Sequence, residues 1–75
     1  MKIIDVSDPS LYKINHIQGS INIPYNDLIN NYRKYLNKHE KYYLYCNSGK
    51  LSKRAQIILS SLGYQVIYME KSVRL

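Results

Sequence analysis

Short apolar runs recur along this chain of 75 residues, and polar or turn-forming residues close each of them. Runs rich in β-branched and aromatic side chains occupy residues 3–6, 20–23, 42–45 and 65–69. Their length and composition are typical of β-strands. The sequence therefore predicts four short strands.

Apolar side chains at helical spacing fill two of the segments between these strands. Residues 28–36 form one such segment, with Asn26 as its expected N-cap. Residues 52–62 form the second, and Gly63 suits the left-handed position that ends many helices. Residues 11–17 are expected to be irregular or to form one helical turn. The pattern thus predicts two clear helices.

Strands that alternate with helices favour a single α/β domain, residues 1–75, with a mainly parallel sheet flanked by helices. A chain of this length buries about 60% of its unfolded surface, so its stability is expected to be marginal. The tail from residue 70 onward is expected to be loose. Ligands of open parallel sheets bind beyond the carboxyl ends of the strands, which is where we expect the site.

The net charge is +6, from eleven Lys and Arg residues against five Asp and Glu residues. This balance favours anionic partners, but it does not by itself indicate nucleic-acid binding. The N-terminus has no apolar stretch for a signal peptide, and no run approaches the length of a membrane span. A single cysteine then fits a reducing compartment, so we expect a cytoplasmic protein. No Cys and His cluster suggests a metal site, and no cofactor is expected.

Cys46, the single cysteine, lies where the third predicted strand gives way to the following helix. Free backbone N–H groups and the positive end of a helix dipole favour thiolate there, and thiolate is the nucleophilic form. Gly49 allows a positive φ and leaves room for a ligand against the backbone. We therefore expect a cup of hydrogen-bond donors around the sulfur. Its expected members are Cys46, Asn47, Ser48, Gly49, Lys50, Leu51 and Ser52.

Basic residues close to this loop are expected to add to the effect of the donors. Lys50, Lys53 and Arg54 raise the local positive potential, which would lower the pKa of the thiol and attract small anions such as thiosulfate.

Three interpretations of Cys46 differ in the chemistry that the loop supports. A free cysteine is most often a small buried apolar residue, but packing alone leaves the loop unexplained. A cysteine phosphatase clamps phosphate with an Arg six positions after the cysteine, and this chain has Ser52 there. Sulfur transfer needs N–H donors that hold a persulfide and no arginine fork. The loop therefore favours sulfur transfer over phosphate chemistry.

Three segments resemble the rhodanese family of sulfurtransferases. Residues 3–6 (Ile-Ile-Asp-Val) look like the family's opening strand, and residues 15–24 are similar to its Gly-His-Ile-Pro-Gly-Ala-x-Asn-Ile-Pro signature. Residues 46–52 (Cys-Asn-Ser-Gly-Lys-Leu-Ser) resemble the loop of small single-domain rhodaneses of the phage-shock type, Cys-Asn-Ala-Gly-Arg-Gln-Ser. Together the segments span nearly the whole chain in the order expected of the family.

The resemblance implies a sulfurtransferase that moves a sulfane sulfur from thiosulfate or a persulfide donor to a thiol or cyanide through a Cys46 persulfide. It implies that residues 47–51 supply loop amides, that Lys50 steers the substrate and that His16 is structural. The alternatives make His16 a general base for Cys46, or a metal ligand together with His39 and Cys46.

The chain also departs from the family pattern. Leu51 stands where many active members have Arg or Thr, and it cannot hold an anion. The family's first strand and helix and its last helix lack counterparts, so we expect a reduced rhodanese-like fold shortened at both ends. The strand at residues 65–69 would then be an exposed apolar edge, which predicts weak self-association or docking on a partner chain. Two alternatives to an enzyme follow: a sulfur relay loaded by a protein donor, and a degenerate module kept for protein contacts.

Overall fold

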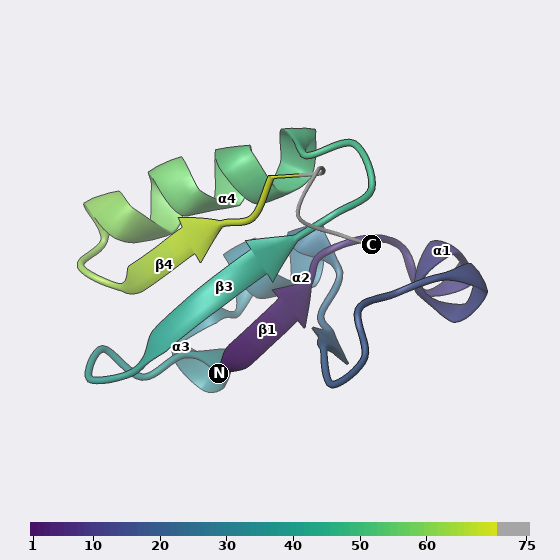
Figure 1. Ribbon diagram of the computed structural model, residues 1–75. Helices are drawn as coiled ribbons and strands as arrows, with labels where there is room; N and C mark the ends of the chain where they lie inside the picture. Colours follow the sequence, from purple (N-terminus) through teal and green to yellow (C-terminus); the bar gives the residue numbers. More distant parts are fainter. Residues whose placement is uncertain (71–75) are drawn as a thin grey trace.

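A four-stranded parallel sheet forms the centre of the computed structural model, which describes residues 1–70 (Figure 1). Its strands are β1 (Lys2–Asp5), β2 (Ile21–Asn22), β3 (Lys41–Tyr45) and β4 (Gln65–Tyr68), in the order β2-β1-β3-β4. Every neighbouring pair is parallel. The predicted α/β class and parallel sheet are confirmed, whereas the tail predicted to be loose falls almost entirely outside the described residues.

Four helices connect the strands: α1 (Pro9–Ile14), α2 (Tyr25–Asn30), α3 (Tyr32–Tyr35) and α4 (Lys50–Ser61). Helices α2, α3 and α4 cover one face of the sheet, while α1 lies beyond the carboxyl end of β1 (Figure 1). In the same view the chain leaves the tip of β3, loops over and enters α4. The carboxyl end of the sheet therefore brings α1 and the start of α4 to the same edge.

The hydrophobic core lies between the sheet and the helices on that face. Leu28 of α2 and Leu59 of α4 are completely buried against Leu44 of β3, which pairs in register with Ile4 of β1. Burial of such a side chain contributes about 1.5–3 kcal/mol to the free energy of folding. The other buried members of this core are Val6, Ile23, Leu36, Tyr42, Cys46, Ala55, Tyr64 and Val66.

Residues on the opposite face of the sheet are also buried. Ile3, Asp5 and Tyr45 alternate with the core residues along β1 and β3, because successive side chains of a strand point to opposite faces. Tyr45 is completely buried, and its hydroxyl has no hydrogen-bond partner within the described part of the chain. A buried hydroxyl without a partner lowers the free energy of unfolding, so the removal of this hydroxyl is a test of how that face is packed.

The helix predicted over residues 28–36 is divided in the structure. Asn31 leaves the helical region, with φ −132° and ψ 35°, and separates α2 from α3. Its side-chain amide donates to the backbone oxygen of Asp27 at 3.2 Å and to Asp27 Oδ1 at 2.8 Å. The apolar spacing continues across the break because Tyr32 and Tyr35 still pack against the core. The prediction of one helix is therefore wrong, although its buried positions are right.

The start of α2 also differs from the prediction. The Leu28 N–H donates to the Pro24 carbonyl at 2.9 Å, so the helix begins at Tyr25 with Pro24 as its N-cap residue. Asn26, predicted to be the cap, instead lies inside the first turn. Backbone hydrogen bonding rather than side-chain capping starts this helix.

Glycines mark both ends of α4. Gly63 has φ +96° directly after the C-cap residue Leu62, which confirms the predicted end of the helix. Gly49 is the N-cap residue, with φ +81°, a conformation that side-chain-bearing residues rarely adopt. Because Gly49 turns the chain so sharply, α4 begins at Lys50, two residues earlier than expected. Leu51 therefore belongs to the first turn of α4 instead of ending a loop.

Strand β4 lies at one edge of the sheet, with β3 as its only neighbour among the described strands. Ile67 at this edge is 43% exposed, as expected of an apolar edge strand. Within residues 1–70, none of the helices has the length and apolar character that crossing a membrane requires.

Candidate active site

Cys46 directly follows β3, at the carboxyl end of the sheet. Its neighbour across the sheet is the end of β1, where the Val6 N–H donates to the Tyr45 carbonyl at 2.8 Å. Cys46 is a free thiol and only 2% exposed. The ends of β1 and β3 therefore hold the cysteine at the carboxyl edge of the sheet, where the sequence predicted a site.

The first turn of α4 surrounds the Cys46 sulfur with hydrogen-bond donors. The Ser52 N–H donates to Sγ at 3.3 Å, and the Ser52 hydroxyl lies 3.5 Å from Sγ. The Ser48 hydroxyl lies 4.0 Å away. Ser52 is itself completely buried, so its contacts with the sulfur are shielded from water. This arrangement holds the sulfur at the positive end of a twelve-residue helix.

The Ser52 hydroxyl carries one proton, and two acceptors compete for it. With a neutral thiol, Cys46 donates to Ser52 Oγ while the Ser52 hydroxyl donates to the Gly49 carbonyl at 3.2 Å. With a thiolate, the same hydroxyl can turn its proton toward Sγ. The Gly49 carbonyl still accepts the Lys53 N–H at 3.2 Å, so it keeps a partner in both states. The site accommodates either charge state without leaving a carbonyl unpaired.

The pKa of the Cys46 thiol reflects opposing influences. Burial raises this pKa, but hydrogen bonds from the Ser52 hydroxyl, the Ser52 N–H, the Ser48 hydroxyl and the Gly49 N–H together lower it below its ordinary value. No charged side chain is among the causes within the described residues. The hydrogen bonds from Ser52, Ser48 and Gly49 are thus the described causes of the lowered pKa, and the contribution of Lys50, Lys53 and Arg54 stays a prediction.

The other residues of the loop differ in their contacts and in their exposure to solvent. Ser48 Oγ accepts the Lys50 N–H at 3.2 Å, which closes the tight turn at Gly49. Lys50 is exposed at the first position of α4, and Asn47 and Leu51 are half-buried. The loop therefore keeps Lys50 in solvent while Leu51 turns toward the protein.

A cleft of about 160 Å³ gives access to Cys46. One wall is the predicted loop, and the other runs from the end of β1 into α1. The Asp5 carboxylate fixes that segment by accepting the Ser7 N–H at 2.8 Å. The residues that line the cleft are Ser7, Asp8, Leu11, Cys46, Asn47, Ser48 and Leu51.

The second wall was missed in the sequence, although a signal for it exists. Ser7 and Asp8 directly follow β1, and β1 is the parallel neighbour of β3. Since the carboxyl ends of adjacent parallel strands open to one edge, the residues after β1 could have been paired with Cys46. Of the seven predicted loop residues, Gly49, Lys50 and Ser52 do not line the cleft, and Ser52 instead supports the sulfur from beneath.

His16 lies outside the lining of this cleft. Its ring stacks on Tyr12 with centroids 3.7 Å apart, and its Nδ1 lies 2.6 Å from the Tyr12 carbonyl oxygen. These contacts agree with a structural role rather than with a base for Cys46. No group of three or more His, Cys, Asp or Glu side chains in residues 1–70 could hold a metal ion.

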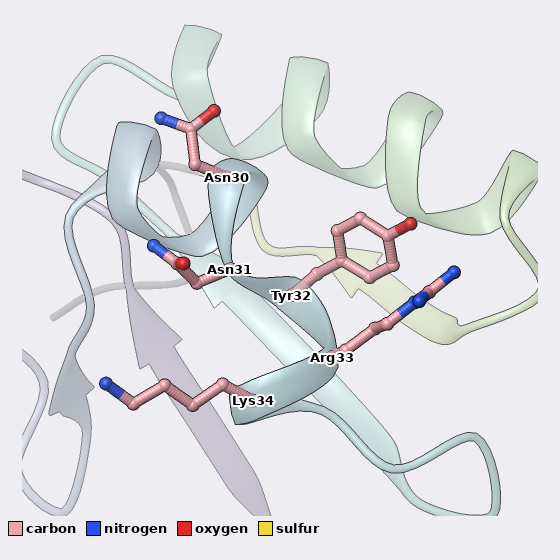
Figure 2. A pocket seen from close by; sticks show the side chains of 5 residues that line it. All are labelled: Asn30, Asn31, Tyr32, Arg33 and Lys34. Atoms are coloured by element: carbon pink, nitrogen blue, oxygen red, sulfur yellow. The ribbon is translucent and has the colours of Figure 1, made fainter.

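A larger hollow, of about 390 Å³, lies where α2 meets α3 (Figure 2). It is lined by Asn30, Asn31, Tyr32, Arg33 and Lys34. Figure 2 shows Arg33 and Lys34 pointing away from each other, so their charges do not converge on one ligand. The smaller cleft is the candidate active site because it holds the thiol.

The fold and this cleft define an α/β domain with a hydrogen-bonded cysteine at the carboxyl edge of a parallel sheet. The model of the rhodanese-like domain family matches residues 1–74. The chain therefore belongs to the rhodanese-like family, a family that includes sulfurtransferases.

Relatives of known name and structure agree with this assignment. The chain is 39% identical over 62 residues to thiosulfate sulfurtransferase PspE of Escherichia coli strain K12, a match covering 81% of this chain and 60% of PspE. It resembles the crystal structure of a rhodanese-related protein from Thermoplasma volcanium, with a TM-score of 0.85, 30% identity, and coverage of 97% of this chain and 72% of that one. A rhodanese-like domain protein from Staphylococcus aureus gives a TM-score of 0.78 at 27% identity, covering 88% of this chain and 64% of that one. The chain thus spans about 60% of the length of its curated relative.

Proposed function

We propose that Cys46 is the nucleophile of a sulfurtransferase that moves a sulfane sulfur from a thiosulfate or persulfide donor to a thiol or cyanide. The observation that carries this proposal is the Ser52 N–H at 3.3 Å from Sγ, in a turn that lowers the pKa of the thiol. The family assignment and the similarity to thiosulfate sulfurtransferase PspE support it.

Transfer proceeds in two displacement steps. The Cys46 thiolate attacks the outer sulfur of the donor, the Sγ–S bond forms, and the bond from that sulfur to the donor breaks. The donor leaves with the electron pair, as sulfite from thiosulfate or as a thiolate from a persulfide. The acceptor then attacks the same outer sulfur and releases the Cys46 thiolate, so the mechanism is ping-pong and requires no cofactor.

Donors around Sγ would stabilise both anionic states of this cycle. The Ser52 and Gly49 N–H groups favour negative charge on the sulfur, and the Ser52 hydroxyl can turn toward it when it ionises. The substrate-binding role of residues 47–52 is part of the proposal, with Ser48 and Leu51 facing the donor from the cleft wall.

Sulfur loading on Cys46 tests the proposal directly. Incubation with a sulfane donor, followed by intact-protein mass spectrometry, is expected to add one sulfur atom, about 32 Da. Cys46→Ser is expected to abolish both the mass gain and thiocyanate formation from cyanide. Transfer that survives in Cys46→Ser would contradict the proposal.

A sulfur relay is the second candidate, and Leu51 is the observation that favours it. This side chain lines the cleft where a cation would hold a small anion, which suits a donor bound by its own protein surface. A relay is loaded by a protein persulfide yet turns over no small donor. A degenerate module for protein contacts is loaded by neither kind of donor. Loading with a small sulfane donor and loading with a protein persulfide, each followed by mass spectrometry, therefore separate the three alternatives.

A further inference from the structure

The walls of the Cys46 cleft carry an unexpected charge. Asp8 is the one acidic residue among those that line the cleft, and none of the lining residues described is Lys or Arg. Asp8 is exposed, and its carboxylate forms no ion pair or hydrogen bond with another described residue. No described basic side chain therefore balances the Asp8 carboxylate at the cleft.

Two of the other lining residues are aliphatic, and they come from different helices. Leu11 of α1 is 43% exposed although it lines the cleft, and half-buried Leu51 comes from the first turn of α4. Two aliphatic side chains at a cleft bind an apolar group by removing its surface and theirs from water. Neither can replace the hydration of an anion.

A sulfane donor must enter this cleft in one orientation. Its outer sulfur has to reach Sγ at the bottom, so the group that will leave extends outward between the two walls. For thiosulfate, that group is a sulfonate, which would lose water beside Asp8 without a basic side chain from the lining.

We propose that the preferred donor carries its sulfane sulfur on an apolar organic group, as an organic thiosulfonate or persulfide, and that Asp8, Leu11 and Leu51 select it over thiosulfate. This inference rests on the proposed sulfurtransferase function. In the loading step the Cys46 thiolate attacks the sulfane sulfur of R–SO2–S⁻, the Sγ–S bond forms and the S–SO2R bond breaks. The products are the Cys46 persulfide anion and the sulfinate RSO2⁻, so charge and electrons balance.

Benzenethiosulfonate and thiosulfate form a suitable pair of probes. Both donors are measured with cyanide as acceptor and thiocyanate as product. Each kcat/KM is then divided by the second-order rate constant of the uncatalysed reaction between the same donor and a free small thiol. This division removes the intrinsic reactivity of the donors. The expected normalised preference for benzenethiosulfonate is at least about tenfold, from burial of an aromatic ring and one less negative charge beside Asp8.

Asp8→Asn isolates the charge in this preference. It is expected to raise kcat/KM for the thiosulfate dianion about threefold to tenfold and to raise that for the monoanionic aryl donor less. Glu40→Gln is the matched control, since Glu40 precedes β3 at the other end of the strand and pairs with Lys2 at the surface. Leu51→Arg is expected to favour thiosulfate further, provided that its circular dichroism matches the wild type.

Failure of the inference and failure of the proposed function give different results. Transfer through Cys46 with a normalised preference for thiosulfate, or an Asp8→Asn variant that changes both donors equally, overturns the inference and leaves the sulfurtransferase standing. No mass gain on Cys46 from either donor overturns both. A preference for the aryl donor that narrows in Asp8→Asn and not in Glu40→Gln supports the inference.

Discussion

Two tyrosines of β3 provide a sharp test of the packing, because their hydroxyls have opposite surroundings. The Tyr45 hydroxyl is completely buried without a partner in the described chain. The Tyr42 hydroxyl accepts the Asn37 N–H at 2.8 Å and helps to close the turn before β3. Substitution by Phe removes one oxygen from each residue and leaves the ring, so Tyr42→Phe is a matched control for Tyr45→Phe.

The expected magnitudes follow from these surroundings. A buried hydroxyl without a partner costs about 1–3 kcal/mol, and the loss of its oxygen leaves a small gap that offsets part of the gain. Tyr45→Phe is therefore expected to raise the free energy of unfolding by about 1 kcal/mol. Tyr42→Phe is expected to lower it by about 1 kcal/mol, because the Asn37 N–H loses its acceptor.

Urea unfolding followed by far-ultraviolet circular dichroism measures both values. For a domain of this size, 1 kcal/mol corresponds to a shift in Tm of about 4–8 °C, so the two variants are expected to move in opposite directions by readily measured amounts. The slope of unfolding against urea should stay constant in both variants. If Tyr45→Phe is destabilised as much as Tyr42→Phe, the Tyr45 hydroxyl has a partner and the reasoning about that face is refuted.

Two further predictions concern reactivity and assembly. Ser52→Ala removes the hydroxyl beside Sγ, so it is expected to raise the pKa of the Cys46 thiol and to move the pH profile of its alkylation by iodoacetamide to higher pH. Ser60 is exposed on the same helix, so Ser60→Ala is the control and should leave the profile unchanged. An unchanged profile in both variants would show that the Ser52 hydroxyl does not lower this pKa. The exposed edge at β4 is expected to cause weak self-association that Ile67→Lys reduces, as measured by light scattering after gel filtration; a strict monomer at high protein concentration would count against it.

The sequence predicted the architecture well because each strand is a separate apolar run between turn residues. The end of α4 was equally readable, since Gly63 is the residue type that a left-handed position favours. The break at Asn31 was not readable, because apolar spacing continues through Tyr32 and Tyr35 while a side-chain hydrogen bond to Asp27 ends the helix. Apolar periodicity indicates which side chains are buried, but it does not reveal a polar side-chain contact that interrupts a helix.

The sequence predicted the residues of one wall of the Cys46 cleft and missed those of the other wall, because only the first wall is continuous in sequence. The loop after β3 is continuous in sequence, so its cysteine, glycine and serines can be read together. Asp8 and Leu11 join it through the pairing of β1 with β3, which a single sequence does not specify. The charge at the cleft, negative at Asp8 rather than positive at Lys50, follows from that tertiary pairing.

The stability of α4 and the reactivity of Cys46 depend on the same contact. The Ser52 N–H is among the first donors of α4, which lack acceptors within the helix. A polar N-cap side chain usually accepts such a donor, but Gly49 has no side chain, and its φ of +81° disfavours replacement by a residue that has one. Cys46 Sγ therefore takes the acceptor role at 3.3 Å. Because a thiolate accepts more strongly than a thiol, ionisation of Cys46 strengthens the cap, and the helix in turn favours the ionised form.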